Sequence, residues 1–171
     1  DCDLNAISSN KGDKATLIGQ KFKFQQITTD SQSIIQNNNC NTVVIATRHD
    51  SHGDFVEKAL KSGKNIFVEK PLCMTKKELS KIKNSYSSNN ILMVGFNRRF
   101  APLIIELKKI LNNLNGPKSF IYTCNAGFID SSHWTQDRKK GGGRLLGEAC
   151  HFIDLIRFLA VSYTHLRAHE T

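Results

Sequence analysis

The sequence predicts an α/β protein built on a doubly wound parallel sheet. Short apolar runs recur along the first hundred residues, and amphipathic, helix-like stretches separate them. The clearest run is Thr42–Ala46, which is β-branched and apolar on both faces, as expected of a central parallel strand. Parallel neighbours need a crossover, so this alternation indicates right-handed βαβ units.

The helices and strands of this first part are predicted from the spacing of the apolar residues and from the residues that start or end helices. Gly19 is expected to end the first helix, and Thr75 with Glu78 forms a capping box at the start of the fourth. We predict strands at 4–7, 22–27, 42–46, 66–68 and 91–94, and helices at 13–19, 31–36, 53–62 and 75–86.

The pattern changes after Arg99. A helix is expected over 103–114, a strand over 119–124, and a long helix from Gly141 to about Ala160. Its expected buried stripe consists of Leu145, Leu146, Ala149, Phe152, Ile153 and Ile156. We therefore divide the chain into residues 1–98, residues 99–161 and a tail, 162–171, which resembles translated adaptor sequence and is treated as non-native.

Composition narrows the functional classes. The 24 Lys and Arg against 15 Asp and Glu give a formal charge of +9, which suits either an anionic partner or a solvated basic surface. No basic block is interleaved with aromatic residues, so we expect no nucleic-acid partner. No apolar run approaches the ~20 residues of a membrane helix. The five cysteines form no CxxC pair, which favours reduced thiols in a cytoplasmic protein.

The first candidate site is the polar stretch after the 42–46 strand. Thr47, His49 and His52 precede a helix whose free N–H groups attract anionic or hydroxylated ligands. The alternative is that Asp50 or Ser51 caps the helix and the histidines are solvated.

The second candidate is Glu69-Lys70-Pro71, directly after the 66–68 strand. Ligands of parallel sheets bind at the carboxyl ends of strands. An amine whose pKa is lowered there can transfer protons, and Pro71 would hold it in one direction. The alternative is a plain ion pair between neighbours.

The third candidate is the last helix, where Glu148, His151 and Asp154 follow at intervals of three. Residues three apart are neighbours on a helix surface, so the acids would flank the imidazole. A solvated face is the alternative. His133 with His151 matches no strong metal spacing, and we expect no metal.

These motifs occur in a specific order together with Gly95-Phe-Asn-Arg-Arg-Phe100 and Gly141-Gly-Gly143. The combination resembles the glucose–fructose oxidoreductase / inositol dehydrogenase family of NAD(P)-dependent oxidoreductases, in particular a polysaccharide-biosynthesis branch. The resemblance runs from about Leu4 to Leu159. It implies a Rossmann-type domain that lacks its first βα unit, followed by the start of an α/β substrate domain.

The resemblance also implies roles for individual residues. Lys70 and His151 would share proton transfer, with Asp154 or Glu148 tuning His151, and the bond before Pro71 would be cis. Lys70, His151, His133 and Trp134 would contact substrate. Cofactor contacts would come from Ser8, Ser9, Lys11, Ala46, Thr47, His49, His52, Glu69, Lys70 and Arg99.

Three departures from the family pattern stand out. The GxGxxG phosphate loop is absent, and we expect that the sequence starts inside a longer chain and stops before the second domain is complete. Gly147 stands where relatives often have Asp. Ser8–Lys11 offers no carboxylate for the adenosine ribose, so NAD and NADP both remain open.

We expect the parent protein to be a cytoplasmic NAD(P)-dependent oxidoreductase. It would move a hydride between a sugar or sugar-nucleotide alcohol or ketone and nicotinamide. Its partner would be this small molecule, with no membrane and with a homo-oligomer at full length. The alternative is a non-catalytic NAD(P)-binding sensor or scaffold.

Overall fold

The chain forms two compact units in the computed structural model, which describes residues 2–160. The first unit comprises the segments up to Ala46, 53–68 and 75–93. The second comprises 47–52, 69–74 and the described residues from Val94 onward. The predicted domain boundary at residue 98 stays a prediction, and the 162–171 tail lies outside the described residues.

The first unit holds two small sheets with parallel strands. Strand β1 (Ala6–Ser8) pairs with β2 (Gln26–Thr28). A second sheet has the order β3 (Thr42–Ile45), β4 (Asn65–Val68) and β5 (Leu92–Val94), and Ile45 lies opposite Val68 in its parallel β3–β4 ladder. The predicted parallel α/β fold is therefore confirmed.

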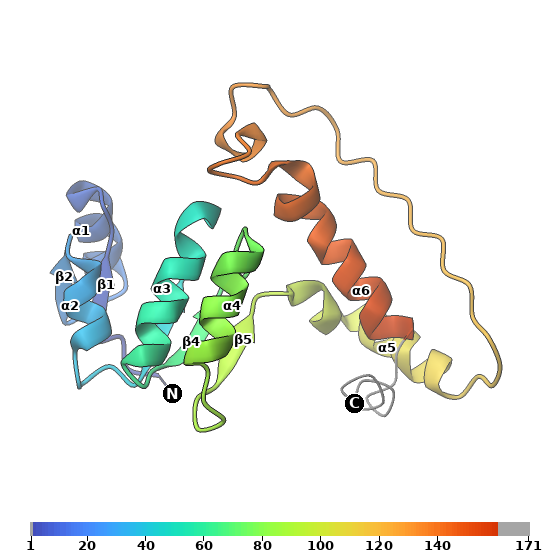
Figure 1. Cartoon of the computed structure of the whole chain (residues 1–171), viewed down its shortest axis with the longest axis horizontal. Coiled ribbons are helices and arrows are strands. Elements are labelled where there is room, and N and C mark those ends of the chain that lie inside the picture. Colours follow the sequence, from blue (N-terminus) through green and yellow to red (C-terminus); the bar gives the residue numbers. More distant parts are fainter. Residues whose placement is uncertain (1, 161–171) are drawn as a thin grey trace. The chain divides into compact units, whose positions relative to one another are not determined.

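Four helices separate these strands along the chain (Figure 1): α1 (Gly12–Lys21), α2 (Ser31–Gln36), α3 (His49–Lys61) and α4 (Lys76–Ser85). Val56 and Ala59 of α3 are fully buried, as is Val68 of β4. Apolar burial of this kind is the main free-energy term that holds the helices on the strands. The predicted capping box of α4 is present, with Thr75 and Glu78 bonded reciprocally.

Three sequence predictions for this unit are wrong in detail. Strand β3 is an edge of its sheet in the described part of the chain, and Val44 is 68% exposed, because no strand pairs with its outer side. Gly19 does not end α1 but lies inside it, where an added Cβ would come within 2.6 Å of the Ile27 side chain. Phe22 caps α1 instead of opening a strand.

The second unit is mostly helical. It contains the 3₁₀ turn η1 (Asn97–Phe100), helix α5 (Pro102–Asn112), the turn η2 (Trp134–Gln136), the π-helical turn η3 (Leu145–Ala149) and helix α6 (Cys150–Ala160). The strand predicted at 119–124 is wrong. Figure 1 shows the chain after α5 as a long trace without helix or arrow. Ile121 is 95% exposed, so the alternating pattern has no partner strand among the described residues.

The last helix also differs from its prediction. A π turn has more residues per turn than an α-helix, so η3 rotates everything before it relative to α6. Leu155 and Leu159 are the buried positions of α6, whereas Leu145 and Ile153 of the expected stripe are 69% and 60% exposed. Ile153, Leu155 and Leu159 all lie within α6, so the predicted stripe is wrong within the regular helix as well as in η3.

Two features that bear on function are absent from the described residues. No helix there is both long and apolar enough to cross a membrane. No cluster of three or more His, Cys, Asp or Glu with metal-holding geometry occurs in residues 2–160. Among the five cysteines, Cys40 is the buried one.

Candidate functional site

Lys70 lies directly after β4, and its side chain reaches the start of the last helix. Its Nζ donates a hydrogen bond to the Gly147 carbonyl oxygen at 2.6 Å. The Lys70–Pro71 peptide bond is cis, as the resemblance implied. Residues 69–74 and the turn η3 belong to the same compact unit. The amine and the helix that carries His151 are therefore joined through Gly147.

Gly147 also makes room for His49. An added Cβ at this position would lie 3.1 Å from Cε1 of His49, tighter than ordinary carbon contacts. A side chain here would push against the imidazole while the same residue's carbonyl holds Lys70. A side chain at 147 would therefore require the His49 ring to shift by a few tenths of an ångström.

His49 is buried and held in one tautomer. Its Nδ1 lies 2.8 Å from the Gly141 carbonyl, which only accepts hydrogen bonds, so Nδ1 carries the hydrogen and the Nε2 of a neutral ring keeps a lone pair. The Trp134 ring meets it edge-on at 4.9 Å. Burial lowers the pKa of His49, the Gly141 bond opposes this, and the charges of Lys70 and His52 lower the pKa further.

Gly141 is fixed by the same contact. An added Cβ would overlap the Thr135 backbone, and the next two glycines have φ of 77° and 72°, a region that side chains disfavour. The glycine run therefore makes the tight turn that brings the Gly141 carbonyl to His49. Helical structure begins at Gly143, so the run also opens the last helix, as the sequence had suggested.

His52 is fully enclosed and bonded on both sides. Its Nδ1 lies 2.7 Å from the Pro71 carbonyl and its Nε2 lies 3.0 Å from the Thr47 carbonyl. Both partners are backbone carbonyl oxygens, which accept hydrogen bonds. His52 is a brace between the turns that follow β3 and β4, with no surface left for a ligand.

His151 is the contrasting histidine. Its Nδ1 is buried and has no hydrogen-bond partner among the described residues, and the Phe96 ring meets it edge-on at 6.2 Å. Burial lowers the pKa of His151, and the positive charges of Lys70 and Arg98 lower it further, against smaller opposing effects of Glu69 and Asp154. These effects favour the neutral ring, whose Nδ1 has no hydrogen-bond partner in the described chain.

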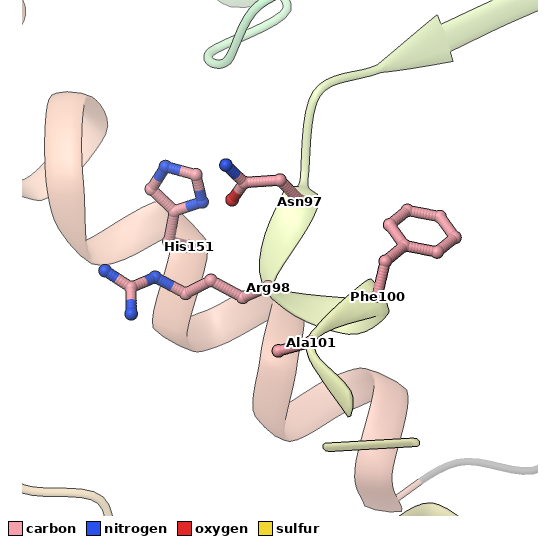
Figure 2. Close-up of a pocket in the computed structure, with 5 residues that line it drawn as sticks. All are labelled: Asn97, Arg98, Phe100, Ala101 and His151. Atoms are coloured by element: carbon pink, nitrogen blue, oxygen red, sulfur yellow. The ribbon is translucent and has the colours of Figure 1, made fainter. Parts of the chain in front are cut away.

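His151 also lines a pocket with residues of η1. The other lining residues are Asn97, Arg98, Phe100 and Ala101. In Figure 2 the side chains of Asn97 and Arg98 extend toward His151, whereas Phe100 points away to the other side of η1. The sequence analysis assigned no role to Asn97 or Arg98, although both lie in the segment Gly95-Phe-Asn-Arg-Arg-Phe100.

The two acids expected to tune His151 are engaged elsewhere. Asp154 forms a two-point ion pair with Arg99, through Nε at 2.6 Å and through Nη2. Glu148 pairs with Arg144 at 3.1 Å. Neither carboxylate forms a hydrogen bond with the imidazole among the described residues, and the tuning of His151 by Asp154 or Glu148 stays a prediction.

Glu69 is differently placed. Its carboxyl group lies 3.3 Å from the position that a Cβ of Gly95 would occupy. No hydrogen bond to this half-buried carboxylate is found within residues 2–160. Glu69 precedes Asp154 among the charges that raise the pKa of His151. Of these two carboxylates, Glu69 therefore has the larger effect on the pKa of His151.

The remaining predicted site residues make contacts with their own near neighbours or with His49. Thr47 bonds Ser51 through their hydroxyls at 2.6 Å, and Ala46 is the last residue before it. Trp134 packs against His49, and His133 is exposed with its Nδ1 on the Thr135 hydroxyl. Ser8, Ser9 and Lys11 lie in the first unit, where the Ser9 hydroxyl accepts from the Lys11 backbone.

Comparison with known families gives a direct match for the first part of the chain. A model described as an oxidoreductase family with an NAD-binding Rossmann fold matches residues 1–96. This span holds all five strands and both residues of the Glu69–Lys70 pair.

Individual relatives extend the likeness through the last helix. Levoglucosan dehydrogenase of Pseudarthrobacter phenanthrenivorans is 28% identical over 170 residues, 95% of this chain and 44% of that protein. An NAD(+)-dependent scyllo-inositol 2-dehydrogenase of Bacillus subtilis is 26% identical over 169 residues, 91% and 48% respectively. A solved levoglucosan dehydrogenase complex with NADH and levoglucosan has a TM-score of 0.77 at 28% identity, covering 92% of this chain and 45% of that one. The chain spans about half the length of these relatives.

Proposed function

The chain belongs to the oxidoreductase family with an NAD-binding Rossmann fold, and on this premise we propose that the whole protein is an NAD(P)-dependent sugar oxidoreductase. It moves a hydride between a secondary alcohol or ketone and nicotinamide. Relatives named for levoglucosan and inositol support a polyhydroxylated substrate. The finer parts of the proposal are a sugar-nucleotide substrate in polysaccharide synthesis, a cytoplasmic location and a homo-oligomer.

The observation that carries this proposal is the junction at Gly147. Lys70, at the end of a parallel strand, bonds the carbonyl at the start of the helix that presents His151. Alcohol oxidation releases a proton from oxygen as hydride leaves carbon, so the site needs groups that hold and pass protons. The Lys70 amine and the His151 imidazole supply this pair.

The residues present fit a nicotinamide cofactor at this edge. Glu69 has a carboxylate without a hydrogen bond in the described chain, and Thr47 follows the adjacent strand; both would hold ribose or amide groups. The nicotinamide supplies hydride acceptance and donation when bound. Ser8, Ser9 and Lys11 carry no carboxylate at the end of β1, which supports use of NADP as well as NAD.

The chain's own residues handle the proton. Lys70 Nζ takes the proton of the substrate hydroxyl during oxidation and returns it during reduction. His151 orients the substrate oxygen with its unused ring nitrogen. His52 and the Gly147 carbonyl keep Lys70 in place, and Trp134 with His49 closes the side of the site near Gly141.

Lys70→Ala in the whole protein tests the proposal. We expect kcat with sugar substrates to fall by ~10²–10⁴-fold, because a general acid–base group is removed. NADH binding, followed by its fluorescence, should stay within about threefold, because one side chain among many is lost. Lys77→Ala, on the exposed face of α4, is the matched control.

Unchanged turnover in Lys70→Ala would refute the catalytic role of Lys70. If the unaltered protein binds NADH yet transfers hydride to no sugar or polyol, the sensor or scaffold alternative is correct instead.

A further inference from the structure

Three arginines surround the first turns of α6, but only two carboxylates there pair with them. Asp154 pairs with Arg99, and Glu148 pairs with Arg144. Arg98 has no acidic partner among the described residues and no hydrogen bond there to an acceptor. The guanidinium next to His151 is thus the one of the three whose charge the chain leaves unbalanced.

Arg98 is nevertheless held in position. Its guanidinium carbon lies 4.6 Å from the centroid of the Phe152 ring. The Phe152 ring also stacks on the Tyr122 ring, with 4.9 Å between the two centroids. A cation held over an aromatic face gives up less side-chain entropy on binding than one that swings freely in water. All five N–H groups of Arg98 remain available for acceptors.

The surroundings of Arg98 supply further donors. The Asn97 amide and the His151 ring line the same pocket, and both side chains extend into the space that Arg98 borders (Figure 2). Arg98 and His151 line this pocket together, and the positive charge of Arg98 lowers the pKa of His151. No carboxylate is among the residues that line this pocket, which presents the Asn97 amide, the Arg98 guanidinium and the His151 ring.

We propose that this pocket binds an oxyanion carried by the sugar substrate, a carboxylate or a phosphate, through Arg98 and Asn97. A guanidinium binds both groups with two parallel hydrogen bonds. This proposal rests on the proposed function and adds the substrate class: an acidic or phosphorylated sugar, not a neutral polyol. The anion would place the reacting carbinol beside His151.

The test compares matched sugars at constant ionic strength. Hydride transfer by the whole protein is measured with glucuronate, glucose 6-phosphate and glucose, and binding of each sugar to the NADH-loaded protein is measured by calorimetry. Arg98→Gln removes the charge, and Arg98→Lys keeps the charge without the paired donors. Arg138→Gln, an exposed arginine outside the pocket, is the control for net charge.

We expect one of the two anionic sugars to exceed glucose in kcat/KM by about tenfold or more. Arg98→Gln should lower kcat/KM for that sugar by about 10- to 100-fold and leave glucose nearly unchanged, since a charge-assisted bond is lost only with the anion. Arg98→Lys should fall between. Preference for glucuronate identifies a carboxylate, and preference for glucose 6-phosphate identifies a phosphate.

The proposal is overturned if Arg98→Gln weakens all three sugars equally, or if Arg138→Gln has the same effect. Failure of the proposed function has a different signature. In that case no sugar accepts or donates hydride, while calorimetry still reports whether the anionic sugar binds in an Arg98-dependent way.

Discussion

Two histidines of the second unit lie in opposite environments. His52, at the start of α3, has both ring nitrogens on backbone carbonyls and no exposed surface. His151, on the first turn of α6, has a buried Nδ1 without a partner in the described chain. The two rings are of the same residue type, and the sequence predicted both as site residues.

The difference distinguishes a histidine that stabilises the fold, His52, from one that is available for catalysis, His151. A side chain whose hydrogen bonds are complete stabilises the fold around it, and breaking them leaves buried carbonyls unpaired. A buried polar atom without a partner costs stability and persists where something else requires it. We therefore expect His52 to matter chiefly for structure and the aim of Lys70, and His151 chiefly for turnover.

The largest expected effect is that of His151→Asn on activity. The variant removes the imidazole next to the reacting group, so kcat in the whole protein should fall by ~10²–10⁴-fold. The melting temperature should change little, because no hydrogen bond to Nδ1 is broken. Turnover within threefold of the unaltered protein, measured by NADH absorbance, would remove His151 from the mechanism.

The same variant has a defined pH signature. Burial and the charges of Lys70 and Arg98 hold the pKa of His151 below 6.5, against Glu69 and Asp154. Below pH 6.5 the unfolded chain binds a proton that the folded state resists, so stability falls as pH drops. The unaltered protein should lose stability more steeply below pH 6.5 than His151→Asn, as followed by thermal unfolding.

A smaller effect on turnover, with a larger one on stability, is expected for His52→Gln. The amide cannot reach both carbonyls as the ring does, and loss of the buried contact with the Pro71 carbonyl costs ~1–3 kcal/mol. We expect a clear drop in melting temperature and a kcat about tenfold lower, because a displaced Lys70 reacts more slowly.

A double-mutant cycle with Lys70→Met shows whether His52 acts through Lys70. If it does, His52→Gln lowers the residual kcat no further once Lys70 is absent, although the melting temperature still drops. Additive losses in kcat would contradict a positioning role. Lys58→Gln, on the exposed face of the same helix, is the matched control.

Sequence reasoning was most accurate where local rules decide the outcome. The alternating strands and helices of the first ninety residues and the capping box at Thr75 depend on neighbours within a few positions. The carboxyl ends of β3 and β4 were also predictable, and with them the importance of the residues after each strand.

The sequence did not predict those contacts of the site that join segments distant along the chain. Nothing near position 147 in the sequence indicates that its carbonyl receives Lys70, or that His49 occupies its side-chain space. The π turn η3 is likewise invisible to a 3.6-residue period. The sequence also did not indicate that Arg99 and Arg144 would pair with Asp154 and Glu148. The alternating segment 119–124 became extended chain because strand formation requires a partner, not only a pattern.

The smallest expected effect distinguishes the predicted role of Glu148 from its observed pairing. Glu148 bonds Arg144 one turn away, with both side chains more than a third exposed, and such pairs contribute ~0–1 kcal/mol. Glu148→Gln should therefore change the free energy of unfolding by less than about 1 kcal/mol in urea titration, and kcat by less than about threefold. A fall in kcat comparable to that of His151→Asn would restore Glu148 as the proton partner of His151 and would mean that Arg144 releases it when substrate binds.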